Sequence, residues 1–165
     1  MKRLLLYART LVHLRPTQVL ALILKRLLPA PTQIFQIHGL RLRPGAGLSP
    51  CLPHSRLQGR DHSFCFLNQE KTFPDGGIDW ASEEMPKLWR YNLHYFDYLF
   101  DAGRSQDVKV LLISDWIAKN PPGTGDGWEP YTLSLRIVNW IKFFLKNDAA
   151  IQEEWLQSLY KQTLW

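Results

Sequence analysis

From Leu88 onward the sequence repeats apolar residues at helical spacing, and this pattern limits the fold more than any other feature. The periodicity predicts helices near residues 89–102, 105–119, 130–146 and 148–163. The segment Asn120–Gly127 contains two prolines and three glycines, and it separates the middle two helices. Pro130 suits the first position of the third helix. The second half of the chain is therefore predicted to be mainly α.

The first half is less regular. Two helices are predicted at residues 3–15 and 17–28, separated by Pro16 and ended by prolines just beyond Leu28. Short extended segments are predicted near residues 34–42 and 62–68, within a stretch rich in glycine and proline. The predicted organisation is a basic amphipathic helical segment at 1–31, a loop-rich connector at 32–87 and a helical region at 88–165.

Composition favours one globular protein without a metal or cofactor. The chain has 165 residues, of which 45% are hydrophobic and 13% aromatic, enough for a sizeable core. Its two cysteines, Cys51 and Cys65, lack the spacing of a metal or redox pair, and no histidines are spaced as a zinc pair. We therefore expect a reduced protein with no metal site and no cofactor.

Charge divides the chain unevenly. Residues 1–60 carry ten Lys or Arg and no acid, whereas residues 61–165 carry ten Lys or Arg and fifteen Asp or Glu. Such a basic segment suits nucleic acid, an anionic membrane surface or an acidic polymer, or it folds back on the acidic remainder. Nucleic acid is disfavoured, because the segment has few aromatic residues and no recognisable binding module.

The amino-terminal residues begin like a signal peptide, but Arg9, His13 and Arg15 interrupt the apolar region and no cleavage site follows. The apolar run Val19–Leu24 is far shorter than the ~20 residues of a membrane span. The prediction is a cytoplasmic protein without a transmembrane segment, with periplasmic or secreted location and contact with a membrane surface left open.

The stretch Trp89–Leu99 combines aromatic residues with Asn, His and Asp. On one continuous helix Tyr91, Tyr95 and Tyr98 would form a stripe, with Asn92 at the edge of the neighbouring apolar face. His94 and Asp97 would form a polar surface pair. The tyrosines are interpreted either as core residues or as ligand contacts, and Tyr95 and Asn92 are the candidates for binding.

The stretch Gly127–Trp140 carries the other candidates. Arg136 and Asn139 are one helical turn apart, and together they could cradle a carboxylate. Alternatively, Arg136 pairs with an acid of a neighbouring helix. Trp128, in a glycine-rich loop, is the candidate for stacking on a sugar ring. The core stripe of this helix is predicted to consist of Leu133, Ile137, Trp140, Ile141 and Phe144, whereas Thr132, Arg136, Asn139 and Phe143 share a different face.

No motif of a common catalytic class is evident. The segment Gly123–Gly127 is rich in glycine, but it lacks the Lys-Ser/Thr ending of a phosphate loop and follows a predicted helix. It is interpreted as a flexible turn. The patterns of serine hydrolases, zinc proteases and calcium loops do not occur.

Leu88–Leu99 and Trp128–Ile141 together resemble the amino-terminal region of heparinase II/III family polysaccharide lyases. The stretches Phe64–Asn68, Gly77–Trp80 and Leu11–Val19 resemble that region too, so the likeness covers nearly the whole chain. The resemblance implies an incomplete (α/α) toroid, followed in the family by more toroid helices and a β-sandwich.

Members of that family cleave uronate-containing glycans by β-elimination. The resemblance therefore implies an acidic polysaccharide as substrate and places the candidates Trp128, Arg136, Asn139, Tyr95 and Asn92 in the substrate groove. The family's catalytic residues come from later toroid helices and the sandwich, so no catalytic residue is assigned here.

The apolar pattern continues to Leu164 and Trp165 without a stop signal, from which we expect the missing toroid and sandwich to lie beyond the last residue. The chain alone is expected to be inactive as a lyase. Two alternatives are kept: a noncatalytic helical module that binds acidic glycan or another anionic surface through residues 1–60, and a structural remnant without a ligand.

Overall fold

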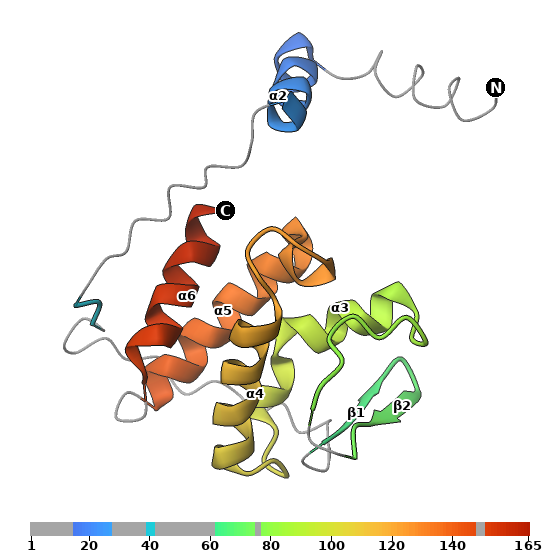
Figure 1. Ribbon diagram of the computed structural model, residues 1–165, viewed down its shortest axis with the longest axis vertical. Coiled ribbons are helices and arrows are strands. Elements are labelled where there is room, and N and C mark those ends of the chain that lie inside the picture. The colour runs from blue at the N-terminus through green and yellow to red at the C-terminus, as the bar shows by residue number, and fades with distance from the viewer. Residues whose placement is uncertain (1–14, 28–38, 42–61, 75–76, 148–150) are drawn as a thin grey trace. The chain divides into compact units, whose positions relative to one another are not determined.

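A computed structural model of the chain describes residues 15–27, 39–41, 62–74, 77–147 and 151–165, which are mainly helical (Figure 1). The chain divides into two compact units, Met1–Phe35 and Gln36–Trp165. No helix in these described ranges has the length and apolar character needed to cross a membrane.

The described element of the first unit is helix α2, Pro16–Leu27. This confirms the helix predicted at 17–28, although Pro16 begins the helix, where its fixed φ suits the first turn. The helix predicted at 3–15 lies outside the described residues except for Arg15, which precedes α2. Most of the strand predicted at 34–42 also lies outside them, and the described residues 39–41 form a turn and no strand.

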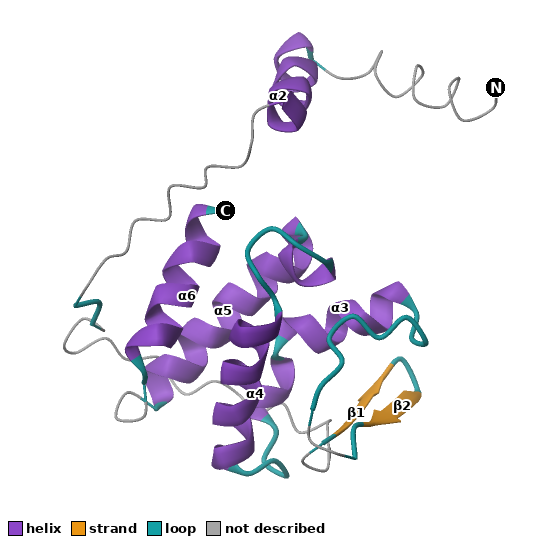
Figure 2. Cartoon of the chain, in the orientation of Figure 1, coloured by secondary structure: helices purple, strands orange, loops and turns teal. Residues whose placement is uncertain are grey.

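The second unit contains a β-hairpin, drawn in orange in Figure 2. Strand β1, Ser63–Phe66, pairs antiparallel with β2, Gln69–Thr72, so that Ser63 lies opposite Thr72. The turn residues Leu67 and Asn68 both have positive φ, as a tight two-residue hairpin requires. The extended segment predicted at 62–68 is thus confirmed for β1. Strand β2 was not predicted, because its residues are all polar and show no alternation.

The helices follow in chain order. They are α3 (Lys87–Tyr95), the 3₁₀ helix η1 (Asp97–Phe100), α4 (Gln106–Lys119), the 3₁₀ helix η2 (Asp126–Trp128), α5 (Pro130–Lys146) and α6 (Glu153–Leu164). Helix α5 contacts α3, η1, η2 and α6, and α4 contacts α6. The helices predicted at 105–119 and 130–146 are confirmed. The last helix starts later than predicted, since Ile151 and Gln152 precede it.

The continuous helix predicted at 89–102 is wrong, because α3 ends at Tyr95. Phe96 adopts a left-handed conformation with φ 64° and ψ 25°, and its side chain is completely buried. The centre of its ring lies 5.5 Å from that of Trp80 and 5.4 Å from that of Trp140. Tyr98 then donates a hydrogen bond from its hydroxyl to the Leu93 carbonyl oxygen at 2.9 Å. Tyr91 and Tyr95 therefore lie on α3 while Tyr98 lies in η1, and the predicted stripe of three tyrosines does not form.

The core of this unit is built largely from aromatic rings. Trp116 and Trp140 meet edge to face at 5.5 Å, and Phe144 stacks on Trp155 at 5.8 Å. The predicted core stripe of α5 is wrong in part, because Ile141 is 39% exposed. The face predicted to be separate is buried, namely Thr132, Arg136, Asn139 and Phe143. Helix α5 has neighbours on several sides, so more than one face is covered.

Candidate functional site

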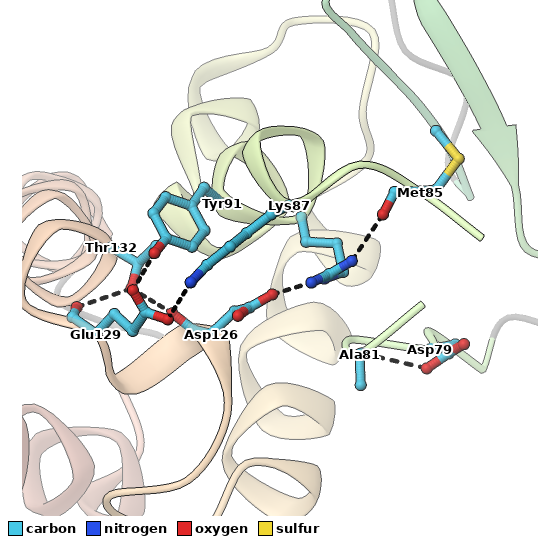
Figure 3. Close-up of polar contacts among 9 residues, drawn as sticks. Asp79, Ala81, Met85, Lys87, Tyr91, Asp126, Glu129 and Thr132 are labelled. Carbon is cyan, nitrogen blue, oxygen red and sulfur yellow. Dashed lines mark hydrogen bonds and ion pairs between the residues drawn. The ribbon is translucent and has the colours of Figure 1, made fainter. Parts of the chain in front are cut away.

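The two stretches that carry the family resemblance meet where α3 lies beside the amino-terminal end of α5 (Figure 3). Arg90 of α3 donates from Nε to Asp126 Oδ2 at 2.6 Å and from Nη1 to the Met85 carbonyl oxygen at 2.7 Å. Both partners in the Arg90–Asp126 ion pair are 18% exposed. This half-buried pair fixes the position of η2 against α3.

A second set of contacts lies at the surface of the same junction. Lys87 Nζ is 2.7 Å from Glu129 Oε1, and the Tyr91 hydroxyl donates to Glu129 Oε2, as Figure 3 shows. The hydrogen bonds from Lys87 and Tyr91 lower the pKa of Glu129. Burial, followed by the bond to Glu129, raises the pKa of Tyr91. Glu129 is therefore a carboxylate at neutral pH, held by one ammonium and one phenol.

Thr132 joins η2 to the first turn of α5. Its Oγ1 lies 2.6 Å from the Asp126 carbonyl oxygen and 2.9 Å from the Glu129 carbonyl oxygen. Thr132 is fully buried, so the hydroxyl satisfies backbone groups that water cannot reach. The segment Gly123–Gly127 was predicted to be a flexible turn. Its carboxyl-terminal end is held in place by the hydrogen bond of Thr132 to Asp126.

The candidate Asn139 is buried and holds the break between α3 and η1. Its Nδ2 donates to the Tyr95 carbonyl oxygen at 2.8 Å and to Asp97 Oδ1 at 2.5 Å. The first bond satisfies a carbonyl at the end of α3. Asn139 and Tyr95 are thus in contact, through the backbone of Tyr95 beneath the surface.

The candidate Arg136 is completely buried. Its Nε donates to Gln162 Oε1 at 2.8 Å and its Nη1 to the Gly127 carbonyl oxygen at 2.7 Å, and its guanidinium lies 3.8 Å from the centre of the Trp116 ring. Within the described residues Nη2 has no hydrogen-bond partner and no carboxylate pairs with the group. Burial lowers the pKa of Arg136 to about 9, so it remains a cation at neutral pH.

The candidate Trp128 is 5% exposed and packs between other indoles. Its Nε1 donates to the Asn120 carbonyl oxygen at 3.1 Å, and its ring lies 5.9 Å from Trp116 and 5.6 Å from Trp165. It lines a pocket of about 150 Å³ between the end of α4 and α6, together with residues that include Asn120, Ser158 and Lys161. Sites for drug-sized ligands are typically larger, about 300–1,000 Å³.

His94 belongs to the same buried layer and is not the surface partner of Asp97 that the sequence predicted. It is 1% exposed, and its Nδ1 accepts a hydrogen bond from Trp116 Nε1 at 3.0 Å. Burial, with a smaller contribution from the Arg136 charge, lowers the pKa of His94 to about 3. His94 is therefore neutral, and its role in this arrangement is to orient Trp116.

The remaining candidates, Asn92 and Tyr95, lie on α3. Asn92 is half-buried and donates from Nδ2 to the Leu88 carbonyl oxygen at 2.8 Å. Tyr95 is 6% exposed, and burial raises its pKa to about 12. Its ring meets that of Tyr131 edge to face at 5.7 Å.

Tyr131 was not predicted as a site residue, yet it is 61% exposed on the first turn of α5. One feature of the sequence could have indicated this exposure. Tyr131 follows Pro130 in the stretch Gly127–Trp140, and the first residues of a helix that starts after a loop are often open to solvent. Asn92 and Tyr131 form the more open part of the site, and Tyr95, Trp128, Arg136 and Asn139 form its buried support.

No group of three or more His, Cys, Asp or Glu side chains in the described ranges is arranged to hold a metal ion. A scan against protein-family models finds no match, and searches of curated proteins and of solved structures find none either.

Proposed function

We propose that this chain is the amino-terminal toroid portion of a heparinase II/III-like polysaccharide lyase acting on uronate-containing glycans. One observation carries the proposal: the two stretches on which the family resemblance depends pack directly on each other, through the bond from Tyr91 to Glu129 and the bond from Asn139 to the Tyr95 carbonyl oxygen. Stretches separated by about thirty residues in the sequence thus build one junction, as a shared functional surface requires.

The open part of this junction is the proposed glycan contact. The exposed ring of Tyr131 packs against the buried ring of Tyr95. Asn92 lies three residues before Tyr95 on α3 and supplies an amide. Aromatic rings that stack on the apolar face of a sugar, with amides that bond its hydroxyls, are the usual elements of carbohydrate recognition. Trp128, Arg136 and Asn139 act from beneath, by fixing η2 and the end of α3.

In β-elimination the uronate carboxylate is neutralised, a base removes the adjacent proton and the glycosidic oxygen departs. Neutralisation lowers the cost of the developing enolate by the logic of an oxyanion hole. We assign none of these steps to this chain. The proposal gives it one wall of the groove, which orients the polymer for groups supplied by polypeptide outside it.

Binding of heparin, heparan sulfate and alginate oligosaccharides by isothermal titration calorimetry tests this assignment. We expect Tyr131→Ala to weaken binding of the recognised glycan about tenfold, the loss of one stacking contact. Leu111→Ala, which removes a side chain that is 61% exposed on α4, serves as the matched control and leaves affinity unchanged. Equal affinities for the two variants would contradict the proposed surface.

A lyase assay on the same glycans tests whether this chain supplies catalytic groups of its own. We expect no rise in ultraviolet absorbance from unsaturated ends when this chain is incubated alone. A rise would show that the chain itself supplies the base and acid, and the role as one wall of the groove would have to be abandoned.

A further inference from the structure

Helix α2 carries an exposed apolar stripe that the proposed function does not use. Leu20, Ile23, Leu24 and Leu27 are 56%, 49%, 44% and 73% exposed. Their spacing of three, one and three residues places them along one side of the helix. Gln18, in the first turn, is exposed on another side of the helix.

The charge around this stripe has one sign. Arg15 directly precedes α2, and residues 1–60 contain ten Lys or Arg and no Asp or Glu. An acid-free segment of this kind attracts an anionic surface, whereas an exposed row of Leu and Ile requires an apolar one. A bilayer with anionic headgroups supplies both, and a soluble acidic glycan supplies only the first.

We propose that α2 binds anionic lipid bilayers by lying in the headgroup region, with the Leu20–Leu27 stripe facing the acyl chains. The helix has 12 residues and is therefore roughly 18 Å long, shorter than the ~30 Å hydrocarbon core, so it lies in the interface and does not span it. This inference is independent of the lyase assignment and would bring the chain to a membrane surface.

Flotation of the full chain with vesicles tests the proposal. We expect the partition coefficient on phosphatidylcholine vesicles with about 30% phosphatidylglycerol to be at least tenfold higher than on pure phosphatidylcholine, because basic residues add to binding at an anionic surface. Raising the salt concentration should reduce this difference. Equal partition on the two vesicles, or none on either, overturns the proposal.

The double variant Leu20→Glu/Leu24→Glu tests the apolar stripe. It should reduce partition on the anionic vesicles at least about tenfold, because two of four apolar contacts are lost and two acids are added. Leu111→Glu on α4, at a leucine that is 61% exposed, should leave partition within about twofold. Equal losses in both variants overturn the proposal.

Two further outcomes also count against it. In the first, the stripe packs within the protein. The double variant would then lower both the thermal midpoint of the second unit and the binding to vesicles. The basic segment could bind acidic glycan alone, in which case heparin binding would persist in the double variant and no vesicle would float the protein. An unchanged thermal midpoint together with lost flotation supports the bilayer.

Discussion

Arg136 is a cation inside an aromatic core, held by neutral groups. A buried charge without a counterion is costly, and the guanidinium offsets part of that cost through two hydrogen bonds and the face of Trp116. Removing it would leave the Gly127 carbonyl and the Gln162 amide without their partner.

We predict that Arg136→Ala lowers the free energy of unfolding by about 2–4 kcal/mol, through the cavity and the unsatisfied carbonyl. Urea denaturation followed by tryptophan fluorescence measures the change. Ser134→Ala, at an exposed position of the same helix, should remain within about 0.5 kcal/mol of the parent. A stabilised Arg136→Ala protein would show that the desolvation cost outweighs the contacts.

His94 is predicted to make stability depend on pH. Burial lowers its pKa in the folded protein to about 3, whereas an unfolded histidine titrates near its ordinary 6.5. Below pH 6.5 the unfolded chain therefore binds a proton that the folded chain refuses. The stability from the neutral imidazole is complete above pH 6.5 and is lost as pH falls toward 3.

Between pH 7 and pH 4.5 this loss should be about 2 kcal/mol, measured by urea denaturation at each pH. In His94→Gln the part of the dependence due to this residue should disappear. Trp116→Phe keeps the imidazole but removes the donor to Nδ1 together with part of a buried ring. It should therefore lower stability at every pH while the dependence on pH remains. An unchanged slope in His94→Gln would assign the dependence to other groups.

At the scale of elements, η2 is held so closely against α3 and α4 that its one glycine has no room for a side chain. A Cβ added at Gly127 would lie 2.8 Å from His94 Nδ1 and 3.2 Å from Trp116 Cζ2. Both rings are buried, so neither can move without disturbing the core.

We therefore predict that Gly127→Ala lowers the free energy of unfolding by about 1–3 kcal/mol, the usual cost of overpacking. Gly77→Ala is the matched control, because the added Cβ would meet only Lys119 Nζ at 3.8 Å. Thermal unfolding of the two variants measures the difference. Similar thermal midpoints for the two variants would mean that the residues around Gly127 can move to accept a methyl group.

The sequence predicted the long helices well, because α4 and α5 repeat apolar residues over three or more turns. Helix α4 follows the N-cap Ser105, and α5 starts at Pro130. It did not predict the end of α3, since neither glycine nor proline marks Phe96 and the left-handed turn depends on tertiary packing. Strand β2 was missed for a similar reason: its pairing with β1 is not visible in its own residues.

The sequence selected the stretches that contain the candidate residues. It did not predict which of their side chains are buried. A helical projection places Arg136 and Asn139 on a common face, but it does not show which faces have neighbours. Both proved buried because α5 is covered by α3, η1, η2 and α6. Tyr131, which the projection did not select, is the exposed member.

At the scale of the whole molecule, the described core is contained in the second unit. Its buried apolar side chains come from residues between Phe64 and Trp155. Helix α2, the described element of the first unit, supplies none of these side chains. We therefore expect the second unit to unfold cooperatively as a unit of its own.

We predict that removing residues 1–35 changes the free energy of unfolding of the remaining unit by less than about 1 kcal/mol. Urea denaturation of the shortened and full chains, followed by tryptophan fluorescence, measures the change. A shortened chain that fails to unfold cooperatively would show that the first unit completes the core, and it would weaken the inference about α2 as well.

The turn at Phe96 has a consequence for how this region tolerates change. Glycine would adopt its backbone angles without steric conflict, but it would leave an empty space where the phenyl group meets Trp80 and Trp140. Other large apolar residues would fill the space and still suffer the unfavourable backbone geometry. No single replacement both favours the left-handed backbone and fills the space of the phenyl ring. Any substitution at Phe96 that relieves the backbone strain therefore also removes packing in the core.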